Sequence, residues 1–347
     1  MASYLKVKAG LADSARRTLI GNSLFDKKRR VEHSASYVLF PIQSISKATI
    51  KKLFGNSNVE ILERRAKEEA SGRGYRELLE DVLNKKELGE LDRGFEALGN
   101  IALVRIPDSL KRKEKRIATA LMESHKNIKT VLAKGATRGI FRTRRLRFVA
   151  GKRNFVAEHK ENGCVFAFDT RKAFFSVGLA FERNRINSLI KGRETVLVLF
   201  AGVGPFAIEI AKRHPNTKVV AVELNKSAYL AMKENIKRNR VENVTAVHAD
   251  ARELPKMYKS FADRIIMPMP KSSLGFLNEA LAYAKKSATM HLYSFGASDS
   301  AFSDVAEKIE EHAKKNGYGV RILLSRVVTP YSTKEVEIVI DYKIAKR

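Results

Sequence analysis

The residues best suited to chemistry form a glycine-containing segment, FAGVGPF, at residues 200–206. It stands between a continuous apolar run, TVLVLF, and an apolar-periodic stretch, PFAIEIAKR, which predict a buried strand and a helix. Gly202 and Gly204 let a backbone approach a ligand closely, and the amide groups that open a helix suit a polar or anionic ligand. Glu223 closes the next predicted strand, where an acidic side chain accepts hydrogen bonds from ribose hydroxyls in doubly wound folds. The pattern therefore predicts a nucleotide-type cofactor site.

The kind of nucleotide is less constrained. Ala207 stands where the dinucleotide fingerprint needs a third small residue, so a nicotinamide cofactor is not excluded. Asp250 follows a third predicted strand, NVTAVHA, and two more strands are predicted at the end of the chain, within residues 321–344. This acid and this terminal strand pair favour the arrangement of S-adenosylmethionine-dependent methyltransferases.

The elements that position these residues alternate between strand and helix from about residue 156, which indicates a parallel sheet. Asn162-Gly163, between two strand-like segments, predicts a two-residue hairpin. The two consecutive strands at the end of the chain cannot be parallel neighbours without a crossover, so one of them must enter antiparallel. Helices are expected over Phe181–Leu189, 205–213, Ser227–Asn239, Leu274–Lys286 and Ser300–Asn316.

Two smaller units are predicted ahead of this sheet. Residues 1–60 indicate a small αβ domain, with strands at SYLKVKA and YVLFPI and helices over Leu11–Asn22 and Ser44–Leu53. Residues 61–74 are polar and punctuated by glycine, which is typical of a linker. Residues 75–155 indicate a basic α+β domain. The predicted fold class is therefore α/β: a Rossmann-like catalytic domain over 156–347 with an antiparallel last strand, preceded by two small α+β domains.

The charge of the chain points to a polyanionic partner. The 347 residues include 66 Lys and Arg against 38 Asp and Glu, a formal net charge of +28. Residues 124–157 carry ten Lys or Arg and no acid. A run of charge is often only a solvated face, but this one favours a surface that faces nucleic acid. Phosphate contacts of this kind supply affinity and no sequence information.

Other features exclude whole classes of protein. Cys164 is the only cysteine, so an internal disulfide and a cysteine-based zinc site are excluded, and no metal site is expected. No apolar run approaches the roughly 20 residues that span a bilayer. The first residues lack the apolar stretch of a signal peptide. We therefore expect a cytoplasmic protein without a membrane partner.

Several segments carry a family resemblance. They are FRTRRLRFVAG, EHKENG, FFSVGLAFERNRI, VLFAGVGPFAIEIAK, VVAVELNKSAYLAMKENIKRN, HADARE and DRIIMPMPKS. Their order and spacing resemble those of the archaeal and eukaryotic tRNA (guanine-37-N1)-methyltransferases, the archaeal members most closely. The likeness covers nearly the whole chain, and the block from 141 to 271 is specific to this family and its wybutosine-pathway relatives.

The resemblance implies an activity and a set of site residues. Such enzymes transfer the methyl group of S-adenosyl-L-methionine to N1 of the guanine immediately 3′ of the tRNA anticodon, and a small N-terminal domain contacts the tRNA elbow. Glu182 matches the general base, and Arg142 matches the residue that stabilises guanine O6. Cofactor-binding positions fall at Arg183, Phe200, Gly202, Gly204, Glu223, Leu224, Asp250, Ala251, Pro268 and Pro270. Substrate contacts fall at Phe174, Arg144 and Arg145, and a monomer is expected.

The chemistry requires this pair of side chains. Guanine N1 carries a proton at neutral pH, so methylation there needs a base, and negative charge grows on O6 as the proton leaves. Without the resemblance, Glu182 would be interpreted as an exposed helix residue paired with Arg185 or Arg183. Arg142 would be interpreted as one more phosphate contact.

Three residues depart from the family pattern. Pro268 stands where an asparagine is common, Phe174 lacks an aromatic hydroxyl, and Val198 replaces an acid before the glycine loop. They leave three alternatives open: aminocarboxypropyl transfer from the same cofactor, methylation of a tricyclic wyosine intermediate, and a non-catalytic tRNA-binding relative. The segments Val177-Gly178-Leu179 and GVGPF favour the methylating branch over the aminocarboxypropyl branch.

Overall fold

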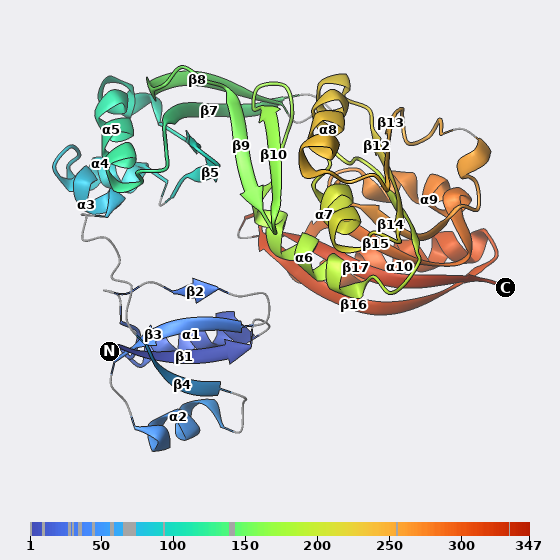
Figure 1. Ribbon diagram of the computed structural model, residues 1–347, viewed down its shortest axis with the longest axis horizontal. Coiled ribbons are helices and arrows are strands. Elements are labelled where there is room, and N and C mark those ends of the chain that lie inside the picture. The colour runs from blue at the N-terminus through green and yellow to red at the C-terminus, as the bar shows by residue number, and fades with distance from the viewer. Residues whose placement is uncertain are drawn as a thin grey trace. The chain divides into compact units, whose positions relative to one another are not determined.

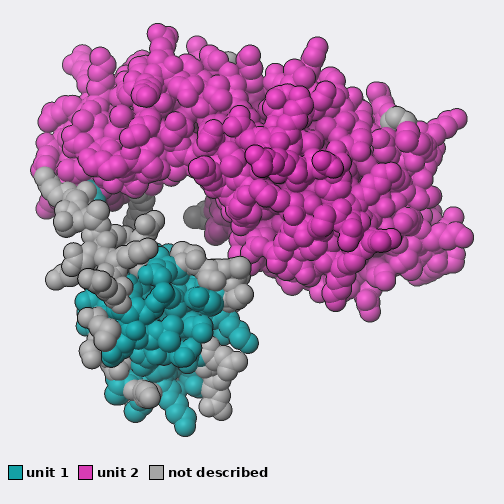
Figure 2. All heavy atoms as spheres, viewed as in Figure 1, with its two compact units in different colours: residues 1–74 teal, residues 75–347 magenta. Residues whose placement is uncertain are grey.

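The computed structural model of the chain describes residues 2–8, 11–26, 29, 31–33, 37–43, 46–55, 59–64, 74–92, 94–138, 143–254, 256–332 and 334–347. The chain forms two compact units, residues 1–74 and residues 75–347 (Figure 2). The predicted boundary at 155/156 falls inside the second unit and stays a prediction.

The first unit is a small antiparallel sheet covered by helices. Its strand order is β2-β3-β1-β4, and leucine, valine and phenylalanine side chains from β1 and β3 pack with helix α1. Ser46 caps helix α2 by accepting a hydrogen bond from the Thr49 amide. The elements are β1 (Ala2–Lys8), α1 (Ala12–Gly21), β2 (Glu32–His33), β3 (Tyr37–Ile42), α2 (Lys47–Phe54) and β4 (Val59–Arg64).

The second unit begins with a four-stranded sheet, β5-β6-β7-β8. Helix α5 connects β6 to β7, which run parallel, and buries Ile117 and Leu121 against them. The elements are α3 (Tyr75–Glu80), α4 (Lys85–Glu90), β5 (Glu96–Leu98), β6 (Ile101–Val104), η2 (Asp108–Lys113), α5 (Glu114–Ser124), β7 (Thr130–Arg138) and β8 (Thr143–Gly151).

A hairpin follows, as Asn162-Gly163 predicts. Strands β9 (Val156–Glu161) and β10 (Cys164–Asp169) pair antiparallel, and both turn residues have positive φ angles, 46° and 77°. The free edge of β10 is held by helix α8 (Lys226–Asn239), because Asn239 and Asn235 accept hydrogen bonds from the amides of β10 at 2.8 Å. The hairpin is thereby fixed to the large sheet that follows.

The large sheet has seven strands in the described part of the chain, in the order β13-β12-β11-β14-β15-β17-β16 (Figure 1). The first five run parallel, and β17 pairs antiparallel with both neighbours, as the two consecutive terminal strands predict. The strands are β11 (Thr195–Val198), β12 (Lys218–Glu223), β13 (Val244–His248), β14 (Ala262–Met267), β15 (Ala284–Ala297), β16 (Tyr318–Pro330) and β17 (Glu335–Lys346).

Helices cover both faces of this sheet. Val196 and Val198 of β11 pack with α6, α7, α8 and the hairpin, whereas Leu197 packs with α9 and α10 on the opposite face. Burial on both faces explains the continuous apolar run of β11. The helices are η3 (Val177–Leu179), α6 (Ala180–Leu189), α7 (Pro205–Arg213), η4 (Lys256–Tyr258), η5 (Ser273–Phe276), α9 (Leu277–Tyr283) and α10 (Ala301–Lys315).

Two predicted boundaries are wrong. The helix predicted over Leu274–Lys286 ends at Tyr283, because Ala284 already pairs with Ala262 and the following residues extend β15. Residues 61–64, predicted to open the linker, belong instead to β4, which continues to Arg64 in register with β1. Residues 65–73 of the predicted linker lie outside the described residues. Ser44, predicted to open the second helix, lies outside the described residues.

Candidate active site

The glycine loop links strand β11 to helix α7 through unusual backbone angles. Phe200, Gly202 and Gly204 have positive φ angles of 55°, 59° and 91°. Gly204 is the N-cap of α7 and Pro205 occupies its first turn, where a missing amide hydrogen costs nothing. A Cβ at position 204 would lie 2.8 Å from Cγ of Met232, so only glycine fits there without displacement.

Glu223 fastens this loop to the neighbouring strand. Its Oε2 accepts a hydrogen bond from the Gly202 amide at 2.7 Å, and its Oε1 accepts one from the Asn225 amide at 2.7 Å. Burial raises the pKa of the Glu223 carboxyl, and these two backbone amides oppose that rise. Each carboxylate oxygen retains a lone pair that can accept a further hydrogen bond, such as one from a ribose hydroxyl.

A cavity of about 360 Å³ opens at the carboxyl ends of the parallel strands, where open α/β sheets bind their ligands. It brings together most of the positions predicted to bind cofactor, with Gly204 just outside its wall. The predicted residues that line it are Phe174, Arg183, Phe200, Gly202, Glu223, Leu224, Asp250, Ala251, Pro268 and Pro270.

The cavity also contains residues that the sequence did not single out. Phe276 packs edge-on against Phe200 with ring centroids 4.8 Å apart, and the Arg252 guanidinium lies 5.3 Å from the Phe276 ring. Arg252 also binds Asp250 through its side chain, at 2.9 and 3.0 Å. These aromatic and charged groups suit a flat base next to a polar edge. Arg252 could have been noticed, since it lies two residues after Asp250.

Glu182, on helix α6, does not line the cavity and is only 1% exposed. Its Oε2 accepts hydrogen bonds from Tyr293 Oη at 2.9 Å and from Arg185 Nε at 2.9 Å. Its Oε1 accepts one from Arg326 Nη1 at 2.8 Å. The ion pair with Arg185 is the one expected of a merely structural residue, but the burial contradicts an exposed helix position. Tyr293 and Arg326 come from distant strands, and no local pattern could have identified them.

Arg183 is buried and belongs to a cluster of charges in the cavity wall. Its guanidinium binds both carboxylate oxygens of Glu161 and the Ser176 carbonyl, and its Nε lies 3.5 Å from Glu209 Oε1. Burial alone would raise the pKa of Glu161, but hydrogen bonds from His159 and Arg183 lower it to about 2. Burial raises the pKa of Glu209 to about 8. Arg183 is therefore held rigidly against the cofactor cavity.

The predicted substrate residues do not all lie together: Arg144 packs beside Phe174, whereas Arg145 is exposed. The Arg144 guanidinium lies 4.9 Å from the Phe174 ring and donates a hydrogen bond to Glu96 at 2.6 Å. Arg145 is exposed on β8, and Arg142 lies outside the described residues. The segment 124–157 lacks acids in the sequence, yet Glu96 and Glu114 neutralise Arg144 and Arg147 in space. Part of the predicted basic surface is therefore paired.

The departures from the family pattern have structural counterparts. Val198 is fully buried at the end of β11 and contributes no acid to the cavity. Pro268 and Pro270 line the cavity in the loop after β14. A second cavity of about 370 Å³ adjoins the first and shares Pro270 and Ser272 with it. Tyr331 and Phe295 form an aromatic pair in its wall, with centroids 4.8 Å apart.

The strand order, the single antiparallel strand and the acid that receives the glycine loop define the class of the protein. It has the fold of class I S-adenosylmethionine-dependent methyltransferases, preceded by an additional N-terminal unit. Residues 157–322 match the model of the TRM5/TYW2 methyltransferase domain, and residues 75–154 match that of the TYW2 N-terminal domain. The chain belongs to the TRM5/TYW2 family of methyltransferases, as its sequence motifs suggest.

The relatives cover the whole chain. The tRNA (guanine(37)-N(1))-methyltransferase Trm5b of Pyrococcus abyssi is 33% identical over 99% of this chain and 100% of that protein. Its crystal structure matches with a TM-score of 0.72 over the same shares. The complex of aTrm5 with tRNALeu matches at 26% identity and a TM-score of 0.69, covering 98% of this chain and 99% of that one.

A relative with a different activity covers less of the chain. The tRNA(Phe) (4-demethylwyosine(37)-C(7)) aminocarboxypropyltransferase of Methanocaldococcus jannaschii is 32% identical over 60% of this chain and 82% of that protein. The M. jannaschii TYW2 structure with AdoMet matches at 26% identity and a TM-score of 0.59, over 73% of this chain and 100% of that one. The cofactor of this chain is accordingly S-adenosylmethionine. No helix among the described residues is long and apolar enough to cross a membrane.

Proposed function

We propose that this protein transfers a methyl group from S-adenosylmethionine to N1 of guanosine 37 in tRNA. The observation that carries the proposal is the cavity at the carboxyl ends of the parallel strands, where the cofactor positions of the family converge. The full-length likeness to Trm5b supports this activity over others in the family. The net charge of +28 suits a tRNA substrate.

The residues present fit the cofactor. Glu223 offers its free lone pairs to the ribose hydroxyls, and the aromatic surface that Phe200 and Phe276 present in the cavity wall suits the adenine ring. Asp250 also lines the cavity, with one lone pair not used by Arg252. When bound, S-adenosylmethionine supplies an electrophilic methyl group on a positively charged sulfur.

Glu182 is the general base of this proposal. The guanine N1–H bond would break and its proton would pass to a carboxylate oxygen of Glu182. The freed electron pair of N1 would bond to the methyl carbon as the bond from that carbon to sulfur breaks, which leaves the sulfur as a neutral thioether. Negative charge on O6 is stabilised by Arg142, as the family resemblance implies. Arg183, the residue after Glu182, lines the cavity, and Tyr293, which donates a hydrogen bond to Glu182, packs against the cavity residue Phe206 with ring centroids 6.1 Å apart.

The variant Glu182→Gln tests the role of the base. An amide cannot accept the N1 proton, so single-turnover methylation of an unmodified tRNA transcript should slow by about a hundredfold or more. Binding of tRNA should change less than about twofold, since the side chain is buried. Glu307→Gln, on the exposed face of α10, is the matched control and should react at the wild-type rate. Equal losses of rate and of tRNA affinity would contradict the assignment.

Aminocarboxypropyl transfer is a second candidate. It is favoured by one observation, the match of residues 75–154 to the TYW2 N-terminal domain. The same cofactor and the same cavity would serve, with a different carbon of the cofactor attacked. The covered share of the chain favours methylation, because the aminocarboxypropyltransferase matches only 60% of it.

A further inference from the structure

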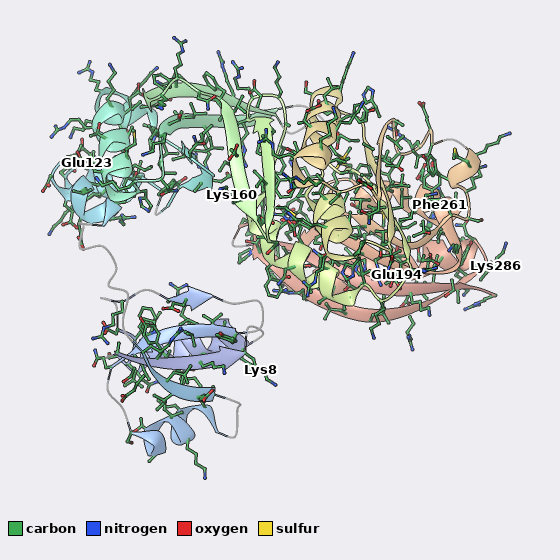
Figure 3. All side chains as sticks on the ribbon, viewed as in Figure 1. Lys8, Glu123, Lys160, Glu194, Phe261 and Lys286 are labelled. Atoms are coloured by element: carbon green, nitrogen blue, oxygen red, sulfur yellow. The ribbon has the colours of Figure 1, made fainter. Side chains whose placement is uncertain are left out.

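A chain of buried polar side chains leads from Glu182 into the centre of the large sheet. Asp341 of β17 faces His291 of β15, and both are almost fully buried. His291 Nε2 lies 2.7 Å from Arg264 Nη1, and a guanidinium can only donate. His291 therefore carries its proton on Nδ1 and donates it to Asp341 Oδ1, at 2.7 Å. Glu194, labelled in Figure 3, completes the chain by accepting from Arg264 Nε at 2.7 Å.

Arg185 joins this chain to the base. One guanidinium is shared between two carboxylates. It binds both oxygens of Asp341 and donates through Nε to Oε2 of Glu182, and its Nη2 lies 2.8 Å from the same oxygen. Burial alone would raise the pKa of Asp341, but hydrogen bonds from His291 and Arg185 hold it at about 2. Asp341 therefore stays ionised, and its negative charge lies one guanidinium away from Glu182.

The partners of Glu182 differ in their freedom to leave. Tyr293 is fully buried, and the Arg185 side chain is 13% exposed and held at both ends. The Arg326 side chain is 34% exposed, and its guanidinium lies 4.4 Å from the ring of Phe181, itself an exposed residue. Arg326 is thus the partner that the incoming guanine can displace from Glu182. Its departure leaves Oε1 of Glu182 as the oxygen that receives the proton.

We propose that Asp341 is a positioning residue for methylation, which acts through Arg185 to fix the Glu182 carboxylate. This inference rests on the proposed function of Glu182. The charged and titratable groups that bind Glu182 are Arg185 from α6, Tyr293 from β15, Arg326 from β16 and, through Arg185, Asp341 from β17. Without Asp341, the Arg185 guanidinium loses the carboxylate that orients it and no longer holds Glu182 in one place.

A double-mutant cycle tests the inference. Single-turnover methylation is measured for the wild type, Asp341→Asn, Glu182→Gln and the double variant. Asp341→Asn should slow the reaction about tenfold or more, and the double variant should be no slower than Glu182→Gln alone, since the effect of Asp341 passes through the base. In Asp341→Asn, the loss should fall on the rate at saturating tRNA, and tRNA affinity should stay within about twofold of the wild type, because Asp341 is buried.

Controls separate this role from folding. Cofactor affinity and melting temperature identify a variant that is misfolded. Arg185→Lys gives a second route to the same cycle, because an ammonium keeps the charge but cannot span both carboxylates. Asp263→Asn removes an ion-paired carboxylate, bound to Lys285 at 2.8 Å, from the opposite end of the sheet and should keep the wild-type rate.

The outcomes are distinguishable. If Asp341→Asn slows the double variant by the same factor as it slows the wild type, or weakens tRNA binding as much as it slows the reaction, the positioning role is overturned. Wild-type activity of Glu182→Gln would instead contradict the proposed base itself, whatever Asp341 does.

Discussion

At the scale of single residues, the cofactor wall contains a proton-sharing pair. Glu209 is almost fully buried, accepts a hydrogen bond from Asn162 at 2.8 Å, and lies against the Arg183–Glu161 ion pair. One positive charge thus serves two carboxyl groups in a dry environment, so one of them keeps its proton. Glu161 is the ionised member and Glu209 the protonated one, which fixes Arg183 without a net buried charge.

This pair predicts a pH dependence of stability. The pKa of Glu209 is raised from 4.5 to about 8. The protonated carboxyl therefore stabilises the folded state fully below about pH 4.5, and this stabilisation is lost as pH rises towards 8. Glu209→Gln stays neutral and should not lose it. The melting temperature of the wild type should therefore fall relative to that of the variant between pH 5 and 8, by at least about 2 °C for each unit by which the pH is raised. An exposed control, Glu234→Gln on α8, should show no such trend, and a constant difference for Glu209→Gln would contradict the shared proton.

The sequence predicts some of these residues and not others. Glu223 and Gly202 are found by local pattern, because strand, turn, helix and acid follow one another along the chain. The environment of Glu182 is not, because Tyr293, Arg326 and Asp341 lie 111 to 159 residues away on strands whose neighbours only the sheet order decides. A periodic pattern reports which residues are buried, but not which buried polar groups meet.

At the scale of elements, the junction of β11 and α7 is the part of the site most closely dictated by sequence. Gly202 and Gly204 both adopt positive φ angles, but their surroundings differ. A Cβ at Gly202 would have no atom nearer than 3.7 Å, whereas one at Gly204 would lie within 3.0 Å of side chains of α7 and α8. A side chain would therefore strain the backbone at both positions, but it would overlap with neighbouring atoms only at Gly204.

The pair of variants Gly202→Ala and Gly204→Ala separates these effects. Each should lose about 1 kcal/mol from the left-handed backbone of a residue with a Cβ. Gly204→Ala should lose about 1–3 kcal/mol more, because the added methyl group overpacks the interface between α7 and α8. Denaturant unfolding measures the stability, and calorimetry of S-adenosylmethionine binding shows how far the loop is disturbed. Equal stabilities of the two variants would contradict the packing described for Gly204.

The element predictions fail where long-range pairing overrides local preference. The segment after α9 has a helical pattern up to Lys286, yet Ala284 joins the sheet through its pairing with β14. Strand β4 has no strong signal of its own and forms because β1 offers it an edge. In both cases the deciding contacts are distant in sequence, whereas α7 and α8 carry their own start signals, Pro205 and the Asn225 cap.

At the scale of the whole molecule, the net charge and the fold both suit a polyanionic substrate. The net charge of +28 attracts a polyanion without reading its sequence, so the choice of one nucleotide must come from the catalytic unit. The pairing of Arg144 and Arg147 with acids shows that the basic segment also has an internal structural role. Under the proposed function, recognition of the target guanine depends on the cavity and on the residues around Glu182.

The most direct test of the account is the identity of the modified base. Labelled S-adenosylmethionine is incubated with unmodified tRNA transcripts that carry G or A immediately 3′ of the anticodon, and the nucleosides are analysed by mass spectrometry. The account predicts N1-methylguanosine from the G transcript and no product from the A transcript. An aminocarboxypropyl product, methylation at another position, or no modification by a protein that binds both tRNA and cofactor would contradict it.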